Sequence, residues 1–256
     1  ANSIELTGNY LFIQNRGTGA AQQTTAVYNS GRYARIANNN IKANGSHNVG
    51  KQLENCYVTG LENRGDYLLL SDNNVVGEWG GRCLGFVNYG QYVKADGNKI
   101  LSTHTIHGCS IRQYGRRGIF SNNIVTSTSR NPRLVEICGD ENLLQGNVID
   151  ALMRNACYSG CCVRVTGGAQ PVRKVLIRGN LLAGAVDAGV QLRHCERCAV
   201  TDNSIEGVPQ RAHFTPVLLS EGDNTVCDNL LDDWLQPDEQ KAADNLDDDR
   251  IVSVYE

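Results

Sequence analysis

Short apolar runs separated by asparagines recur along almost the whole chain. Residues 118–125, GIFSNNIV, are typical, because an apolar run meets an asparagine and a second apolar run leaves it. Further copies are LFIQN at 11–15, YARIANNNI at 33–41, YLLLSDNNVV at 67–76, YVKADGNKI at 92–100, NLLQGNVI at 142–149, VLIRGNLL at 175–182, CAVTDNSI at 198–205 and TVCDNLL at 225–231. The asparagines preceding the second run are Asn15, Asn40, Asn74, Asn98, Asn123, Asn147, Asn180, Asn203 and Asn229. Self-similarity with a period of this size predicts a stacked repeat architecture.

Each repeat resolves into three short strands. In one copy, 134–138 is an apolar strand, 139–141 a polar turn, 142–145 a second strand, 146–147 a bend and 148–150 a third strand. The period is too brief for a crossover helix, and the signature of a tight hairpin is missing. We therefore predict an all-β chain of about nine three-stranded coils, stacked in parallel as a solenoid.

The recurrent asparagine has a structural explanation. Asparagine tolerates the left-handed region of backbone conformation at a bend. Its amide can also bond the same amide in the next coil, as in other stacked strands. The pattern therefore predicts an asparagine ladder without chemistry of its own.

The repeat indicates one elongated domain over residues 1–230, followed by an acidic cap or tail over 231–256. The tail aspartates do not match the EF-hand loop, which favours a solvated face over a calcium site. Insertions at 43–55, 150–162 and 167–174 are predicted to be loops around a binding face. A third rim is predicted at 77–82, where Trp79 could stack on a sugar or cap the core.

Composition excludes some partners. The net charge of −3 and the pI of about 6.0 imply no general attraction to nucleic acid. No apolar run approaches the roughly 20 residues of a membrane span. The start ANSIELTGNY shows no signal peptide and is typical of a mature or trimmed terminus.

Ten cysteines are many for this length. Cys109 and Cys161 fall on predicted inward positions, where thiols would fill space. The group Cys157, Cys161, Cys162, Cys195 and Cys198 could instead hold disulfides or zinc. Packing or disulfides are favoured over zinc, because the group contains one CxxC and irregular spacing.

Side-chain alternation predicts a polar column on one sheet. Where the apolar residues of a strand face the core, the residues between them face outward. On four successive strands these outward residues include Arg112, Glu136, Arg164 and Arg193. Because stacked coils lie about 4.8 Å apart, these four would be neighbours. A charge ladder that only solubilises the sheet is the alternative interpretation. The residues expected to flank the same groove are His107, Tyr114, Arg116, Arg117, Arg133, Tyr158 and His194.

A positive groove of this kind suits an extended anionic polysaccharide, since arginine binds carboxylates bidentately. Eliminative cleavage of a uronate polymer needs the carboxylate neutralised, a base for the adjacent proton and an acid for the leaving oxygen. Arg112, Arg164 or Arg193 could neutralise, and Tyr114, His107 or His194 could move protons. Epimerisation shares the first two needs. Hydrolysis needs two carboxylates, and Glu136, beside Asp140 and Glu141 in the turn, is the one acid on the column.

The coil pattern resembles the right-handed parallel β-helix, or pectate-lyase-like, superfamily. Within it, VQLRHCERCAVTDN at 190–203 resembles a coil of the alginate lyase and chondroitinase B family, which implies a catalytic role for Arg193 with His194 beside it. LVEICGDENLLQGN at 134–147 resembles the coil that carries the catalytic lysine of that family, and here that position is Cys138. Either the base has changed identity or the activity differs. Neither the polygalacturonase motif nor the Asp-Pro-His-Asp motif of mannuronan epimerases is present.

The favoured function is a lyase acting on an acidic, uronate-containing polysaccharide. The alternatives are a non-catalytic carbohydrate-binding or tailspike-like virion β-helix, and a purely structural β-helix. We expect a monomer for the enzyme and a trimer for the tailspike-like protein. The expected location is secreted, cell-surface or periplasmic, or else a virion. The pattern requires no metal or cofactor and leaves calcium assistance open.

Overall fold

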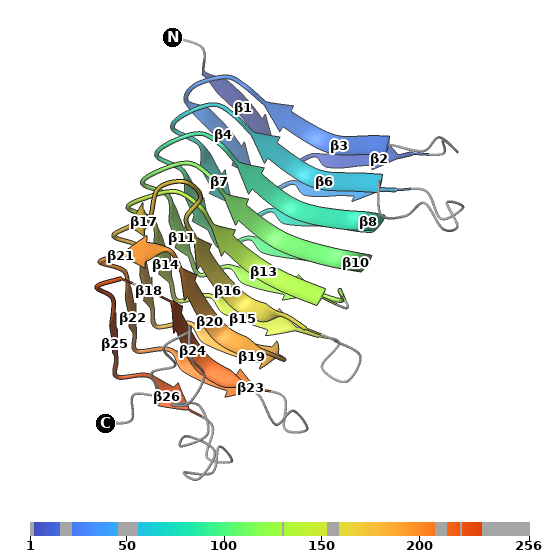
Figure 1. Ribbon diagram of the computed structural model, residues 1–256. Coiled ribbons are helices and arrows are strands. Elements are labelled where there is room, and N and C mark those ends of the chain that lie inside the picture. Colours follow the sequence, from blue (N-terminus) through green and yellow to red (C-terminus); the bar gives the residue numbers. More distant parts are fainter. Residues whose placement is uncertain are drawn as a thin grey trace.

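The chain winds into nine coils that stack as a right-handed parallel β-helix (Figure 1). The computed structural model describes residues 3–15, 22–45, 56–129, 131–152, 159–207, 214–220 and 222–231. All strand pairings given for these residues are parallel, as the short period predicts. Within the described residues, no helix has the length and apolar character that crossing a bilayer requires.

One face of the coil is a nine-stranded sheet, here called sheet A. Its strands follow one another in coil order. They are β1 (Ile4–Thr7), β4 (Ala34–Ala37), β7 (Leu69–Ser71), β9 (Lys94–Asp96), β11 (Ile119–Ser121), β14 (Leu143–Gln145), β18 (Leu176–Arg178), β22 (Ala199–Thr201) and β25 (Thr225–Cys227).

The other two faces belong to one fifteen-stranded sheet, sheet B, which bends around a corner. Its first face contains β2 (Tyr10–Gln14), β5 (Asn40–Asn44), β12 (Ile124–Ser127), β15 (Val148–Ala151), β19 (Leu181–Ala185), β23 (Ser204–Gly207) and β26 (Leu230–Leu231). Its second face contains β3 (Gln22–Asn29), β6 (Cys56–Asn63), β13 (Asn131–Ile137), β16 (Cys161–Thr166), β20 (Ala188–Arg193) and β24 (Thr215–Ser220). β8 (Asn74–Asn88) and β10 (Lys99–Gln113) run through both faces. A small extra pair joins β17 (Val172–Arg173) to β21 (Cys195–Glu196).

Three columns of apolar side chains fill the interior, one from each face. Phe120 of sheet A, Val125 of the first face and Ile111 of the second face are fully buried and belong to one core cluster. The same positions are apolar in the neighbouring coils, as in Leu144, Ile149 and Val135. Burial of these columns supplies the main driving force for stacking.

An asparagine ladder lines the corner between sheet A and the first face of sheet B. Asn123 donates its amide to Asn147 Oδ1 at 2.9 Å and accepts one from Asn98 at 3.0 Å. The prediction is confirmed from Asn98 to Asn229 and wrong in the first three coils, where the ladder residues are Asn9, Asn39 and Asn73, not Asn15, Asn40 and Asn74.

The bend itself is made by the residue before each ladder asparagine. Asn122 has a φ of 55° and Asp72 has the same value, while Gly97 and Gly146 occupy the equivalent position in other coils. The ladder asparagines are therefore not the left-handed residues, contrary to expectation. Two residues separate the strands at this corner in all nine coils, from Thr7 to Tyr10 through Cys227 to Leu230.

A second, unpredicted ladder lies at the corner that follows the second face. Asn63 donates to Asn88, Asn88 donates to Gln113 at 2.8 Å, and Gln113 donates to Asn142 at 3.1 Å. All four side chains are buried. Two amide ladders thus fix the register of the strands between them.

Extra residues enter the coils beside the second face. The step from Asn39 to Asn73 is 34 residues and includes 46–55, and the step from Asn147 to Asn180 is 33 residues and includes 153–158. The predicted loop at 167–174 contains the short strand β17, which pairs with β21. The loops predicted at 43–55 and 150–162 are too long, because their described ends belong to strands β5, β15 and β16. The rest of these two segments, 46–55 and 153–158, lies outside the described residues. So does 232–256, and the predicted acidic cap or tail stays a prediction.

The predicted rim loop at 77–82 is wrong, because these residues belong to strand β8 and pair with β10. Trp79 has a φ of 57° and is half-buried at the point where sheet B turns from its first to its second face. A side chain at Gly77 would meet the backbone of Leu84 across the bend of β8 itself, and one at Gly80 would meet Val58 and Cys56 of the neighbouring strand β6.

On the second face, the alternation of inward and outward side chains is interrupted once in each coil. In β10, Ser110 and Ile111 both point inward, and the pairing with β8 passes from Cys109↔Leu84 to Ile111↔Phe86. Cys162 and Val163 repeat this arrangement in β16. Cys109 and Cys161 therefore lie on the outer side, beneath longer side chains, and their predicted inward orientation is wrong.

The described cysteines, all except Cys157, are free, so the structure contains no disulfide among them. Within the same residues, no group of three or more histidine, cysteine or acidic side chains could hold a metal ion. Cys161 and Cys162 face opposite sides of their strand, which separates two members of the predicted cluster.

Candidate functional site

A charged column crosses the second face of sheet B. Arg112 of β10 lies opposite Glu136 of β13, and Glu136 lies opposite Arg164 of β16. The next residue in this column is Gln191, not Arg193. Arg193 instead lies opposite Thr166, one outward position further along the strand, so the predicted four-residue column holds for its first three members.

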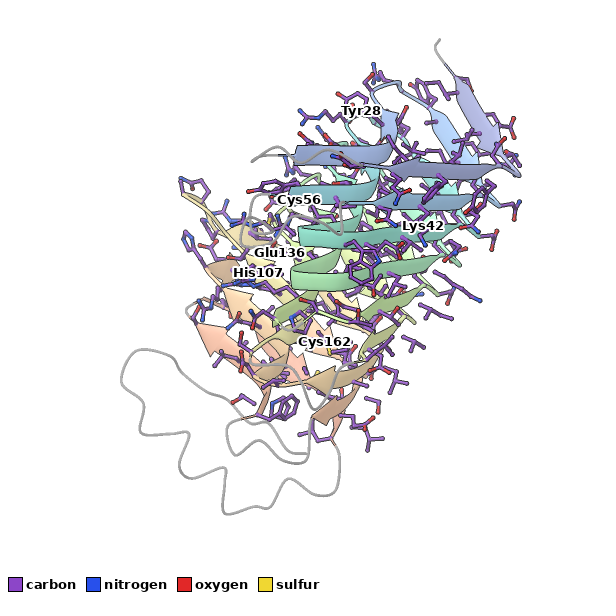
Figure 2. All side chains as sticks on the ribbon, turned by 90° about the vertical axis from the view of Figure 1, so that its right-hand side faces the viewer. Tyr28, Lys42, Cys56, His107, Glu136 and Cys162 are labelled. Carbon is purple, nitrogen blue, oxygen red and sulfur yellow. The ribbon has the colours of Figure 1, made fainter. Side chains whose placement is uncertain are left out.

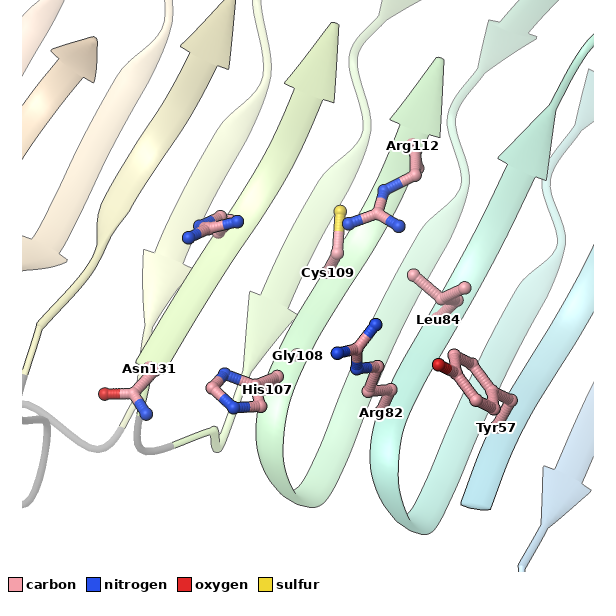
Figure 3. Close-up of a pocket in the computed structure, with 9 residues that line it drawn as sticks. Tyr57, Arg82, Leu84, His107, Gly108, Cys109, Arg112 and Asn131 are labelled. Carbon is pink, nitrogen blue, oxygen red and sulfur yellow. The ribbon is translucent and has the colours of Figure 1, made fainter. Parts of the chain in front are cut away.

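Two hollows open on this face. The first, of about 230 Å³, is called the N-terminal hollow and is lined by Tyr57, Arg82, Leu84, His107, Gly108, Cys109, Arg112, Asn131 and Arg133 (Figure 3). The second, of about 260 Å³, is called the C-terminal hollow and is lined by His107, Asn131, Pro132, Arg133, Ser159, Gly160, Cys161, Arg164, Asp187, Ala188, Gln191 and Arg193.

The hollows form one groove, because His107, Asn131 and Arg133 line both of them. The groove crosses β6, β8, β10, β13, β16 and β20, which at the usual strand spacing corresponds to about 24 Å. Figure 2 shows His107 and Glu136 on the same side of the stack, with Lys42 of the first face on the other side. An extended chain of several sugar units fits a site of this length.

The groove is basic in an acidic chain. The two hollows are lined by Arg82, Arg112, Arg133, Arg164 and Arg193 and by one carboxylate, Asp187, and a second carboxylate, Glu136, is paired with Arg112. With histidine neutral, five positive and two negative charges leave an excess of three positive charges, against −3 for the whole chain. Such a concentration of one sign raises the local concentration of anions.

Glu136 is held by Arg112 on the groove floor. Arg112 Nη2 lies 2.6 Å from Glu136 Oε2, while the contact from Arg133 to Glu136 Oε1 is longer, at 3.9 Å. Burial alone lowers the pKa of Arg112, but Cys109 and Glu136 more than offset this, and its pKa is raised above the ordinary value. Arg112 is therefore charged and paired with Glu136.

The pKa of Arg164, unlike that of Arg112, is lowered. Burial lowers its pKa, and the positive charges of Arg133 and Arg193 lower it further. Its Nε, like that of Arg112, is shielded from solvent without a hydrogen-bond partner. Among the described residues, neither Arg164 nor Arg193 forms an ion pair. Arg133, Arg164 and Arg193, here called the arginine cluster, thus present positive charge that a bound anion would compensate.

The second groove carboxylate, Asp187, is also engaged. Its Oδ2 accepts a hydrogen bond from the backbone N–H of Gly160 at 2.8 Å, and its own N–H donates to Gly160 O at 2.9 Å. This exchange closes the edge of the C-terminal hollow.

Tyr114 follows Arg112 by two residues and lies outside the lining of both hollows. Its ring stacks on Tyr89 with centroids 4.9 Å apart and planes 6° apart. Burial raises the pKa of Tyr114, and Arg112 offsets part of this rise. The phenol therefore keeps its proton at neutral pH and suits an acid better than a base.

The remaining predicted residues lie outside the two hollows or beyond the described chain. His194 is in a turn, where its Nδ1 lies 3.0 Å from Gly168 O. Arg116 and Arg117 pair with acids in the turn after the second face and line neither hollow. Trp79 lines neither hollow. Tyr158 lies outside the described residues.

Sequence reasoning missed Tyr57, Arg82, Asp187 and Gln191. Tyr57 and Arg82 occupy the same register position as His107, and the Arg82 guanidinium lies 5.3 Å from the Tyr57 ring centroid. The coil interval contained a signal, because Arg82 precedes His107 by 25 residues, the same step as between Asn98 and Asn123.

The sequence matches no family model and no curated protein. Among solved structures, the chain is similar to a double mutant of the periplasmic alginate epimerase AlgG, with a TM-score of 0.52 and 11% identity over 87% of this chain and 50% of that one. It is equally similar to the Dettilon tailspike protein, with a TM-score of 0.52 and 11% identity over 90% and 54%. The chain spans about half the length of these structures. At such low identity the likeness concerns the fold, and the chain has the fold of the right-handed parallel β-helix proteins.

Proposed function

We propose that the groove binds an acidic, uronate-containing polysaccharide and that the protein cleaves it by β-elimination. The observation that carries the proposal is the arginine cluster, whose members Arg164 and Arg193 have no acidic partner among the described residues. A uronate carboxylate is the anion that a basic groove about 24 Å long would meet repeatedly along an extended sugar chain.

The groove residues divide into roles. Arg164, with Arg133 or Arg193, neutralises the carboxylate and so acidifies the adjacent C5–H. His107 takes that proton, the C–H electron pair forms the C4–C5 double bond, and the bond from C4 to the glycosidic oxygen breaks. A water molecule supplies a proton to the departing oxygen. Arg112 acts on the floor by holding Glu136.

The comparisons support a polysaccharide as substrate or ligand, since one similar structure is a periplasmic alginate epimerase and the other is a tailspike protein. Epimerisation shares carboxylate neutralisation and proton removal with elimination. Hydrolysis is less well supported, because both groove carboxylates are engaged, Glu136 by Arg112 and Asp187 by Gly160.

Binding without cleavage is the second candidate function. The position expected for a lysine base is Cys138, a half-buried thiol whose pKa burial raises to about 11, so it is not a base at neutral pH. A tailspike-like binding protein would need only the arginine cluster and the groove. We place either protein outside the cytoplasm or on a virion, and a molecular mass in solution distinguishes the expected monomeric enzyme from a trimer.

The test incubates the protein with alginate, pectate and glycosaminoglycans. Elimination creates a conjugated double bond, and we expect far-ultraviolet absorbance to rise with one of these polymers. Binding of each polymer is measured in parallel by titration calorimetry. Binding without an absorbance rise would support the second candidate. If none of the polymers binds and the absorbance does not rise, the proposal is overturned.

A further inference from the structure

Two stacks of tyrosine rings run along the coils, and they differ in length. The first contains Tyr33, Tyr67 and Tyr92, with centroids 4.9 Å apart at both steps and planes 13° and 2° apart. It lies at the corner after the second face and lines neither hollow. This stack demonstrates that the coil spacing accommodates three flat rings in succession.

The second stack stops after two rings, Tyr89 and Tyr114. The Arg64 guanidinium carbon lies 4.7 Å from the Tyr89 ring centroid, on the strand that precedes Tyr89 in the stack. On the other side, the residue next to Tyr114 in register is Cys138, because Cys138 N–H donates to Gln113 O just as Tyr114 N–H donates to Asn88 O. A small side chain therefore stands where a third ring would continue the stack.

The next position along this line is also small. Thr166 follows Cys138 in register, and Arg193 follows Thr166. The line thus begins at an aromatic ring, crosses two short side chains and ends at a guanidinium. Tyr114 is 41% exposed, which leaves part of its ring accessible to a ligand.

Charged groups of the groove border the same space. Glu136 lies two residues before Cys138 on β13, and Arg164 lies opposite Glu136 on β16. Arg112 lies opposite Glu136 on β10, so Arg112, Glu136 and Arg164 all lie two residues before the register position of Cys138. The space over Cys138 therefore combines one aromatic wall with hydrogen-bonding groups and positive charge.

We propose that the space over Cys138, walled by the Tyr114 ring, is a subsite for one pyranose ring of a uronate-containing chain. This inference rests on the proposed function and assigns it a specific sugar position. The sugar occupies the place that the third tyrosine holds in the other stack. Its apolar C–H face lies against Tyr114, and its carboxylate reaches Arg164 or Arg193.

This arrangement makes Tyr114 a residue that recognises the sugar ring. An aromatic ring buries a large apolar area against a flat partner and retains a polar hydroxyl at its edge. The arginines recognise the carboxylate, so a neutral sugar would gain the stacking contact without the charge contact. Binding should depend on both features.

The experiment measures binding of size-defined oligogalacturonate and oligomannuronate by titration calorimetry. Tyr114→Ala removes the wall, and Cys138→Phe fills the space with a ring that extends the stack. Both should weaken binding by about tenfold or more. Cys138→Ser, which preserves size, and Tyr67→Ala, in the stack outside the hollows, are the matched controls and should bind as the unaltered protein does. Thermal unfolding of each variant verifies that it is folded.

The outcomes separate the two proposals. If the unaltered protein binds neither oligomer, the proposed function fails and the subsite falls with it. If it binds one oligomer and folded Cys138→Phe binds equally well, the groove proposal stands and the subsite is overturned. Loss of binding in Tyr114→Ala and Cys138→Phe, with retention in Cys138→Ser, supports the subsite.

Discussion

Arg112 and Glu136 face each other across β10 and β13, and their side chains form the shortest ion pair on the groove floor, with Arg112 Nη2 2.6 Å from Glu136 Oε2. Only 9% of the Glu136 side chain is exposed, against 27% for Arg112. The carboxylate would therefore remain buried if its partner were removed. This pair belongs to the structure of the groove as much as to its chemistry.

Arg112→Ala should destabilise the protein by about 3 kcal/mol, because it leaves a buried carboxylate without its cation. Replacing both partners, as in Arg112→Leu combined with Glu136→Leu, should cost less than Arg112→Ala alone. Urea unfolding followed by circular dichroism measures both. Equal stability of Arg112→Ala and the unaltered protein would show that the pair contributes nothing.

Arg164→Gln should weaken oligouronate binding by about tenfold or more and leave stability unchanged or slightly higher, since it removes one of three like charges. Binding by the unaltered protein should also weaken as salt rises. Arg178→Gln on sheet A, where Arg178 contacts Gln145, is the matched control and should retain full affinity. If Arg164→Gln and Arg178→Gln bound equally well, the arginine cluster would not be the anion site.

Asn123→Ala should cost about 2 to 4 kcal/mol of stability, because it leaves the buried N–H groups of Asn98 without their acceptor. Asn229→Ala, at the last and more exposed position of the ladder, should cost less. Thermal denaturation of the two variants measures the difference. An equal loss at both positions would contradict the dependence on burial.

Stability should decline in alkaline solution. Burial raises the pKa of Cys109 and of Cys161 from 9.0 to about 12. A raised thiol pKa favours folding fully below about pH 9, and this contribution is lost as the pH rises from about 9 toward 12.

Urea midpoints between about pH 8 and about pH 10.5 measure this decline. A variant with both Cys109→Ala and Cys161→Ala should show a shallower decline, although its stability at neutral pH is lower through lost packing. An identical slope in the two proteins would exclude the thiols as the cause.

The solenoid could be predicted because its physical signals are local. Apolar residues such as Phe120, Val125 and Ile149 recur with strand alternation, and the asparagines mark one corner of each coil. The first coils misled the prediction because asparagines occur side by side there. Asn73 is buried in the ladder while Asn74 is exposed, and composition alone does not distinguish them.

The site was less predictable because it depends on register. Glu136 lies 11 residues before Asn147, whereas Arg164 lies 16 residues before Asn180, since extra residues enter the coil between Arg164 and Asn180. Alternation allows both Gln191 and Arg193 to face outward, and only the backbone pairing places Gln191 beside Arg164. The two consecutive inward residues in each coil, such as Ser110 and Ile111, likewise reversed the expected orientation of Cys109.

The constant two-residue corner has a consequence for engineering this protein. The ladder corner admits no change in length, because a left-handed residue and a ladder asparagine must follow each other in all nine coils. The other two corners flank the groove and already differ in length from coil to coil. Loop grafts should therefore be made at those corners, where the rim of the groove could be rebuilt for another sugar while its floor and the register stay intact.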